Sequence, residues 1–160
     1  MNDFDAKLSI RVGSLSFRKT VIQGVRFDGS LVGGKLTVKD ASVRNLAGTS
    51  GQVQGIIFAF TKKPSFKLTV SATSDNVTGL FRFAKIKSSL SPQRFGKMRL
   101  SSHVDLSSDK LKLVTDLSIA DFHVKISGSA EKIYDTPNFD VTLDANHSEL
   151  SKLVTIVGYK

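Results

Sequence analysis

The sequence predicts an all-β fold with minor helix: a curled antiparallel sheet of about nine amphipathic strands, built from repeats, with two short helices. Three observations predict it. Apolar and polar residues alternate through most of the chain, which is typical of strands with one covered and one wetted face. Turn residues recur at short, even spacing, which favours a meander over alternating strands and helices. Two segments match each other at a constant offset, which indicates a repeat.

The first strands follow from period-two alternation near the N-terminus. In residues 8–12 every second side chain is apolar, so the apolar side chains share one side of a strand. A second strand is predicted over residues 25–27, and Asp28-Gly29 directly after it is a hairpin-turn signal. Gly33-Gly34 predicts the next turn.

Three further patterns complete the first half of the chain. Residues 36–38 alternate again after the Gly33-Gly34 turn, and apolar residues follow at Ala41, Val43 and Leu46. Residues 53–60 are more uniformly apolar, which predicts a strand that is covered on both faces. Pro64 then opens another alternating strand over residues 66–72.

The apolar spacing changes after this strand and predicts a helix over residues 76–86. The residues that share its apolar side are Val77, Leu80, Phe81 and Ala84. Asp75 or Asn76 can cap its start. A second short helix is predicted over residues 148–157 by the same spacing. Between the two helices the alternating strand pattern returns, over residues 98–106, 111–119, 122–128 and 139–145.

The repeat joins a strand of the first half to the last strand. Residues 64–72 match residues 137–145, 73 positions later, with identical Pro, Phe, Thr and Ala. The match continues upstream, where residues 53–55 align with residues 126–128, and downstream into both predicted helices. We therefore expect a single β-rich module over 1–160, excised from a longer chain, with repeat units of approximately 36–89 and 98–160.

Charge and composition narrow the classes of function. The chain contains no cysteine, which excludes disulfide scaffolds and thiolate metal sites. The net charge of +9 comes mostly from dispersed lysines, which fit a solvated strand face. The alternative is attraction to an acidic surface, either anionic lipid or nucleic acid. Phenylalanines fall at the apolar phase of strands rather than among the basic residues, so we expect no nucleic-acid partner.

Residues suited to catalysis or metal binding do not cluster in the sequence. The three histidines, His103, His123 and His147, have no nearby ligand at metal-binding spacing. No nucleophile elbow, phosphate-binding loop or dinucleotide fingerprint occurs. We expect a protein that is not an enzyme, with no catalytic residues, no metal site and no cofactor.

Several segments share a pattern of alternating strands, dense glycine turns and a Leu-rich closing helix. They are residues 8–17, 25–29, 33–38 and 53–55, the strand that Pro64 opens, and residues 146–153. This pattern resembles the AsmA-like family of bacterial envelope proteins, which includes the TamB and YhdP types. The resemblance implies a periplasmic module of a parent protein that is anchored in the inner membrane. It also implies a greasy groove that conducts phospholipid acyl chains between the inner and outer membranes and supports outer-membrane integrity.

The expected lining of such a groove is the apolar phase of the strands. These residues are Phe66, Leu68, Val70, Leu100, Val104, Leu113, Leu117, Val124, Ile126, Phe139, Val141 and Leu143. Each of them equally fits a closed hydrophobic core. Two functions therefore remain open: a groove that binds acyl chains, or an envelope scaffold that docks other envelope proteins, for example in outer-membrane protein biogenesis, and conducts no lipid.

Overall fold

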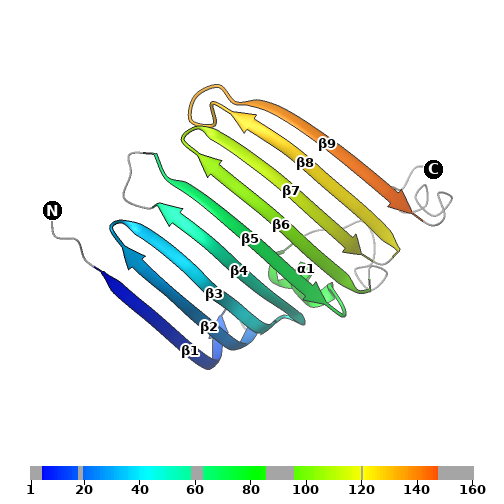
Figure 1. Ribbon diagram of the computed structural model, residues 1–160. Helices are drawn as coiled ribbons and strands as arrows, with labels where there is room; N and C mark the ends of the chain where they lie inside the picture. The colour runs from blue at the N-terminus through cyan, green and yellow to red at the C-terminus, as the bar shows by residue number, and fades with distance from the viewer. Residues whose placement is uncertain (1–4, 18–19, 59–62, 86–95, 120, 148–160) are drawn as a thin grey trace.

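The fold is one open antiparallel sheet, seen here in a computed structural model that describes residues 5–17, 20–58, 63–85, 96–119 and 121–147. Nine strands pair in chain order, each with its sequence neighbours, and the sheet is curled but not closed (Figure 1). The predicted all-β class is confirmed. The strands are β1 (Ala6–Phe17), β2 (Thr20–Val32), β3 (Lys35–Leu46), β4 (Thr49–Phe58), β5 (Ser65–Ser74), β6 (Met98–Ser107), β7 (Lys110–Ile119), β8 (Phe122–Glu131) and β9 (Asn138–His147).

Tight turns explain why the sheet is a meander. Gly33 and Gly34 connect β2 to β3 with φ angles of 53° and 78°. Ala47 and Gly48 connect β3 to β4 with φ angles of 54° and 85°. Two-residue turns with both φ angles positive match the right-handed twist of the strands they join, so consecutive strands become neighbours.

The turn predicted at Asp28-Gly29 is wrong. Both residues lie inside β2, which continues to Val32. The β2–β3 register shifts between Asp28 and Gly29, so the pair marks a bulge and not a turn. The local Asp-Gly signal was overridden because the true turn follows four residues later, at Gly33-Gly34.

The prediction that residues 53–60 form a strand covered on both faces is also wrong, for the residues that the structure describes. Phe58 is 40% exposed. Gln52 and Gln54 of the same strand are exposed on the other side from Val53. Residues 59–60 lie outside the described ranges.

The strand register aligns apolar side chains in rows across the whole sheet. One row, here called the glycine row, contains one residue from each strand in turn: Leu8, Gly29, Val38, Gly55, Leu68, Val104, Leu113, Gly128 and Val141. Apolar residues dominate the rows on either side of it. We call the side of the sheet that carries these rows the apolar face, and the opposite side the polar face.

The glycines in this row bring neighbouring strands close together. A Cβ atom on Gly29 or Gly128 would lie 2.8 or 2.9 Å from a backbone carbonyl oxygen of the next strand. A Cβ atom on Gly55, whose φ is +147°, would overlap the carbonyl oxygen of Lys67. Glycine permits this close approach of backbones, and glycine kinks and bulges are what give sheets their curvature. We attribute the curl of the sheet to this row and to the bulges of β3.

The repeat predicted from the sequence has a structural counterpart in two hairpins. Gly55 of β4 pairs with Leu68 of β5, and Gly128 of β8 pairs with Val141 of β9, so both partners keep the offset of 73 residues. In each hairpin the glycine lies against the carbonyl oxygen of the residue before its partner. The two hairpins therefore share register and local geometry.

The first predicted helix is confirmed. The observed helix, α1 (Thr78–Phe83), lies within the predicted range of 76–86 and is shorter. The Asn76 side-chain oxygen accepts a hydrogen bond from the Thr78 amide at 2.9 Å, which satisfies one donor at the helix start. The helix predicted over residues 148–157 lies outside the described residues.

The α1 helix packs across one end of the sheet. Gly79 lies against Ala47 in the β3–β4 turn, so closely that a Cβ atom would overlap the Ala47 carbonyl oxygen. At the other end of the helix the Phe83 ring lies 6.4 Å from the Phe17 ring of β1, between centroids. Val77, just before α1, is 0% exposed. The helix thus spans the strand ends from β5 toward β1.

We expect Val77→Ala to lower the free energy of unfolding by about 2 kcal/mol, because a fully buried side chain loses two methyl groups and leaves a cavity. The measurement is urea denaturation followed by circular dichroism. Val114→Ala is the matched control, since Val114 is 41% exposed. An equal effect of the two substitutions would contradict the role of Val77 in holding α1 on the sheet.

Candidate functional site

The apolar face is the candidate functional site, and the register builds it from every strand. All twelve residues that the sequence singled out fall on this face, in four neighbouring rows. The row beside the glycine row contains Val70, Ile126 and Leu143, and the row beyond that contains Leu100, Leu117 and Val124. Phe66 and Phe139 lie in the row on the other side.

The apolar face has very little closed core. Among the described residues only four apolar side chains are buried: Val38, Val77, Leu106 and Ala130. The central lining residues, such as Leu68 and Leu113, are half-buried. At the edge strand β9, Phe139 is 71% exposed. Within the described ranges α1 is the only element outside the sheet, so these residues supply no second layer over the apolar face.

Exposure is greatest along both edges of the sheet. Val141 and Leu143 of β9 are 62% and 60% exposed, and Leu8 and Ile10 of β1 are 52% and 43% exposed. The gradient follows from the strand order, because a side chain on β1 or β9 has a neighbouring strand on one side only. Large contiguous apolar surface is rare on a soluble protein and marks a binding surface.

Polar groups on this face are few and neutral. Ser102 and Thr115 are opposite each other in adjacent strands, and their hydroxyl oxygens lie 2.8 Å apart in a hydrogen bond. Each hydroxyl thus satisfies the other, which lowers the cost of placing them among apolar side chains. As far as the structure describes the chain, the rows of this face offer hydrocarbon contact and contain no Lys, Arg, Asp or Glu that would fix a polar substrate.

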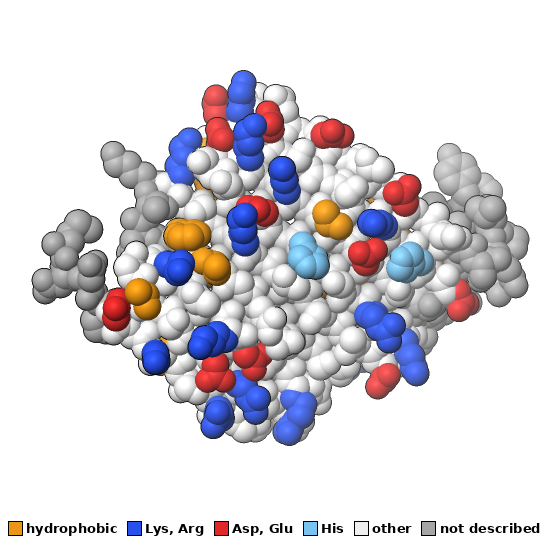
Figure 2. All heavy atoms as spheres, in the orientation of Figure 1, with side chains coloured by type: hydrophobic (Ala, Val, Ile, Leu, Met, Phe, Trp, Pro, Cys, Tyr) orange, Lys and Arg blue, Asp and Glu red, His pale blue; other side chains and the backbone are white. Residues whose placement is uncertain are grey.

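The polar face is strongly charged and wetted. Figure 2 shows basic and acidic side chains spread over this face, with few hydrophobic side chains among them. The Lys67 ammonium lies 3.2 Å from the Asp105 carboxylate, in an exposed ion pair. Such pairs contribute little stability each, about 0–1 kcal/mol, but they keep this face in water.

One exposed contact on the strand ends shifts two pKa values. The hydrogen bond from the Lys110 ammonium to the Glu131 carboxylate, 2.8 Å long, and then the charge of Lys110, lower the pKa of Glu131. The same hydrogen bond and the Glu131 charge raise the pKa of Lys110. The contact is therefore present at neutral pH and is lost as pH falls through the lowered pKa of Glu131.

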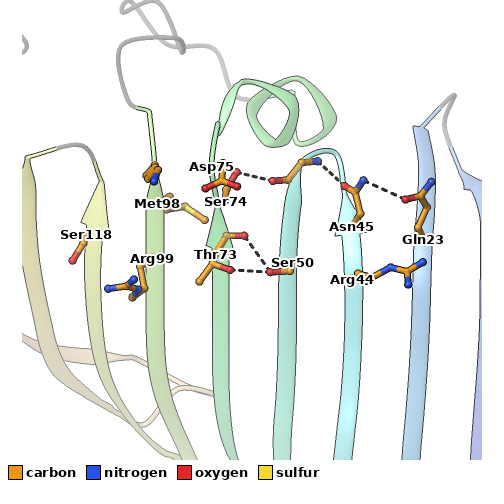
Figure 3. Close-up of a pocket in the computed structure, with 12 residues that line it drawn as sticks. Gln23, Arg44, Asn45, Ser50, Thr73, Ser74, Asp75, Met98, Arg99 and Ser118 are labelled. Atoms are coloured by element: carbon orange, nitrogen blue, oxygen red, sulfur yellow. Dashed lines mark hydrogen bonds between the residues drawn. The ribbon is translucent and has the colours of Figure 1, made fainter.

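A hollow of about 660 Å³ lies on the polar face near α1 (Figure 3). Arg44, Lys97 and Arg99 line it, together with hydroxyl groups such as those of Ser50 and Thr73, which lie 2.8 Å apart. In Figure 3 the guanidinium groups of Arg44 and Arg99 extend in opposite directions from different strands. They do not converge on one ligand, so the hollow is a solvated rim of the sheet.

Side chains that could bind a metal ion are dispersed in the part of the chain that the structure describes. Within these ranges no three His, Cys, Asp or Glu side chains lie close enough to hold a metal ion. His103 and His123 are exposed on the polar face, where His123 Nδ1 forms a 2.9 Å hydrogen bond with the Ser118 hydroxyl. No helix among the described residues has the length and hydropathy to cross a membrane.

The expected lining from the sequence was incomplete. It began at Phe66 and omitted the apolar residues of β1 to β4, including Leu8, Ile10 and Val53, which lie in the same rows. Their alternation was visible in the sequence. The role of Gly29 could not be seen in the sequence, because only the strand register shows that Gly29 belongs to the apolar face.

Comparison of the chain with models of protein families, with curated proteins and with solved structures found no match.

Proposed function

We propose that this chain is a β-groove module that binds the acyl chains of phospholipids on its apolar face. The observation that carries the proposal is the exposure of that face. Phe139 and Val141 are 71% and 62% exposed in a regular strand, where a soluble domain would bury such residues under a second layer. A sheet with one apolar face needs a cover, and a hydrocarbon chain is a cover that needs no specific polar contacts.

The energetics favour a chain molecule as the occupant. Each methylene group removed from water contributes roughly 0.8 kcal/mol. An acyl chain lying along the rows would contact several strands at once, from half-buried Leu113 to exposed Leu143. The neutral lining suits a hydrocarbon tail, and the charged polar face keeps the opposite side in water.

The cellular setting proposed here follows from the resemblance to AsmA-like proteins. The module would belong to a parent protein anchored in the inner membrane, with its sheet in the periplasm. Its apolar face would conduct phospholipid between the inner and outer membranes and so support outer-membrane integrity. The glycine row supports conduction, since it runs from β1 to β9 without a polar side chain and gives a tail a continuous apolar path.

Site-specific photo-crosslinking tests the proposal. A photoreactive amino acid at position 113 or 126 should capture phospholipid from vesicles of phosphatidylethanolamine and phosphatidylglycerol, because Leu113 and Ile126 line the apolar face. Lys112 and Lys125 are the matched controls: each precedes one of these residues in the same strand and is exposed on the polar face. We expect capture at positions 113 and 126 only, detected by mass spectrometry of the adduct.

The scaffold alternative gives a different result. If positions 113 and 126 crosslink to protein and to no lipid in cells of the parent bacterium, the face docks a protein and the lipid proposal is wrong. Native mass spectrometry of the purified chain adds an independent measurement, in which bound phospholipid should appear as discrete mass increments.

A further inference from the structure

The two edge strands of the described sheet, β1 and β9, are long and regular. β1 has 12 residues and β9 has 10, and they lie at opposite ends of the strand order. Neither strand contains proline, and the β8–β9 register is continuous. Natural sheets usually shorten, bulge or interrupt their edges because unpaired backbone groups recruit other strands. Among the described residues, neither edge is shortened, interrupted by proline or paired with a further strand, so both can accept another strand.

The two edges carry opposite charges on the polar face. β1 presents Lys7 and Arg11, and β9 presents Asp140 and Asp144, all four exposed. Across the β1–β2 pair Arg11 lies opposite Arg26, which places two like charges side by side. The β1 edge thus has an excess of positive charge that an acidic strand would relieve.

The opposite charges occupy matching rows. The row that begins at Lys7 passes through every strand and ends at Asp140. The row that begins at Arg11 ends in the same way at Asp144. Extending the sheet by one strand in this register would therefore place each basic residue next to an acidic one.

We infer that this edge binds a second copy of the chain, with β9 of one copy pairing with β1 of the next. β1 and β9 run in the same direction because they are the first and ninth strands of an antiparallel meander, so the pairing is parallel. Asp140 then lies beside Lys7, and Asp144 beside Arg11. The glycine rows of the two copies join, since they begin at Leu8 and end at Val141.

The charges also select this pairing over the alternatives. Two β9 edges would bring aspartates together, and two β1 edges would bring Lys7 and Arg11 together. Like charges in adjacent strands are destabilising, so each self-pairing is disfavoured. Only the head-to-tail contact is attractive, and it joins the copies into an open series with one continuous apolar face. The inference concerns the edges and does not depend on lipid binding.

Charge reversal with sedimentation velocity tests this inference on the purified chain. We expect the unmodified chain to associate more as concentration rises, and less as salt screens the edge charges. Lys7→Glu with Arg11→Glu, or Asp140→Lys with Asp144→Lys, should each weaken self-association by about tenfold or more. Lys39→Glu with Lys112→Glu makes the same change of charge on interior strands and should leave association unchanged.

Mixing the two edge variants is the decisive measurement. Each variant alone has two edges of the same sign, but together their edges are complementary, so an equimolar mixture should recover association. Recovery also shows that both variants are folded. A chain that stays monomeric at all concentrations, or a mixture that stays as dissociated as its components, would overturn the inference.

Discussion

Gly55→Ala should destabilise the sheet by about 3 kcal/mol, a large share of the stability of a domain of this size. The added Cβ atom would overlap the carbonyl oxygen of Lys67, and the φ of +147° at this position is one that side-chain-bearing residues rarely adopt. The obstacle is backbone, which cannot rotate away as a flexible side chain can. The measurement is the midpoint of urea denaturation compared with the unmodified chain.

The other glycines give a graded series for this prediction. Gly128→Ala should destabilise less, because its Cβ atom would lie 2.9 Å from the Asp140 carbonyl oxygen and its φ is not in the positive range. Gly13→Ala is the matched control, since nothing lies within 4 Å of that Cβ position. If the three variants unfold at the same urea concentration, the close approach of backbones in the glycine row does not make glycine necessary for the stability of the sheet.

The strands could be predicted from the sequence because alternation is a property of each strand by itself. Residues 98–106 and 111–119 alternate apart from Ser102, Val114 and Thr115, and β6 and β7 occupy nearly the same positions. The error at Asp28-Gly29 has a physical reason. A turn signal is local, whereas Gly29 is needed where β2 meets Val38 at a bulge, and that requirement comes from the neighbouring strand.

The openness of the apolar face could not be predicted in the same way. An apolar side chain such as Leu113 or Val141 alternates identically whether a second layer covers it or not. Whether such a side chain is covered depends on how many helices or strands are available to form a second layer. Within the described residues there is one short helix for nine strands, and it covers one end of the sheet only.

The repeat could be predicted from the sequence, but the backbone geometry that its two copies share could not. The offset of 73 residues identified Gly55 with Gly128 as matched positions in matched strands. Only the register shows that both glycines face the carbonyl oxygen of the residue before their partner. The match is therefore a shared backbone approach and not only a shared hydrophobic pattern.

Leu113→Asp combined with Ile126→Asp should lower phospholipid capture by at least about tenfold. Both residues lie on the apolar face, in adjacent rows of the adjacent strands β7 and β8. A carboxylate there must either lose its hydration against hydrocarbon or keep water in the path of the acyl chain, and both oppose binding. The measurement is the amount of phosphatidylglycerol retained by the purified chain after incubation with vesicles and gel filtration.

The control places the same two aspartates one residue earlier, as Lys112→Asp with Lys125→Asp. This variant changes the net charge more than the first, yet it alters only the exposed polar face. We expect it to retain lipid as the unmodified chain does, because a carboxylate there stays hydrated and leaves the apolar rows intact. Equal loss in the two variants would mean that lipid is held by the positive charge of the chain. Loss confined to the apolar-face variant, with an unchanged circular dichroism spectrum, would instead locate the hydrocarbon on the open side of the sheet.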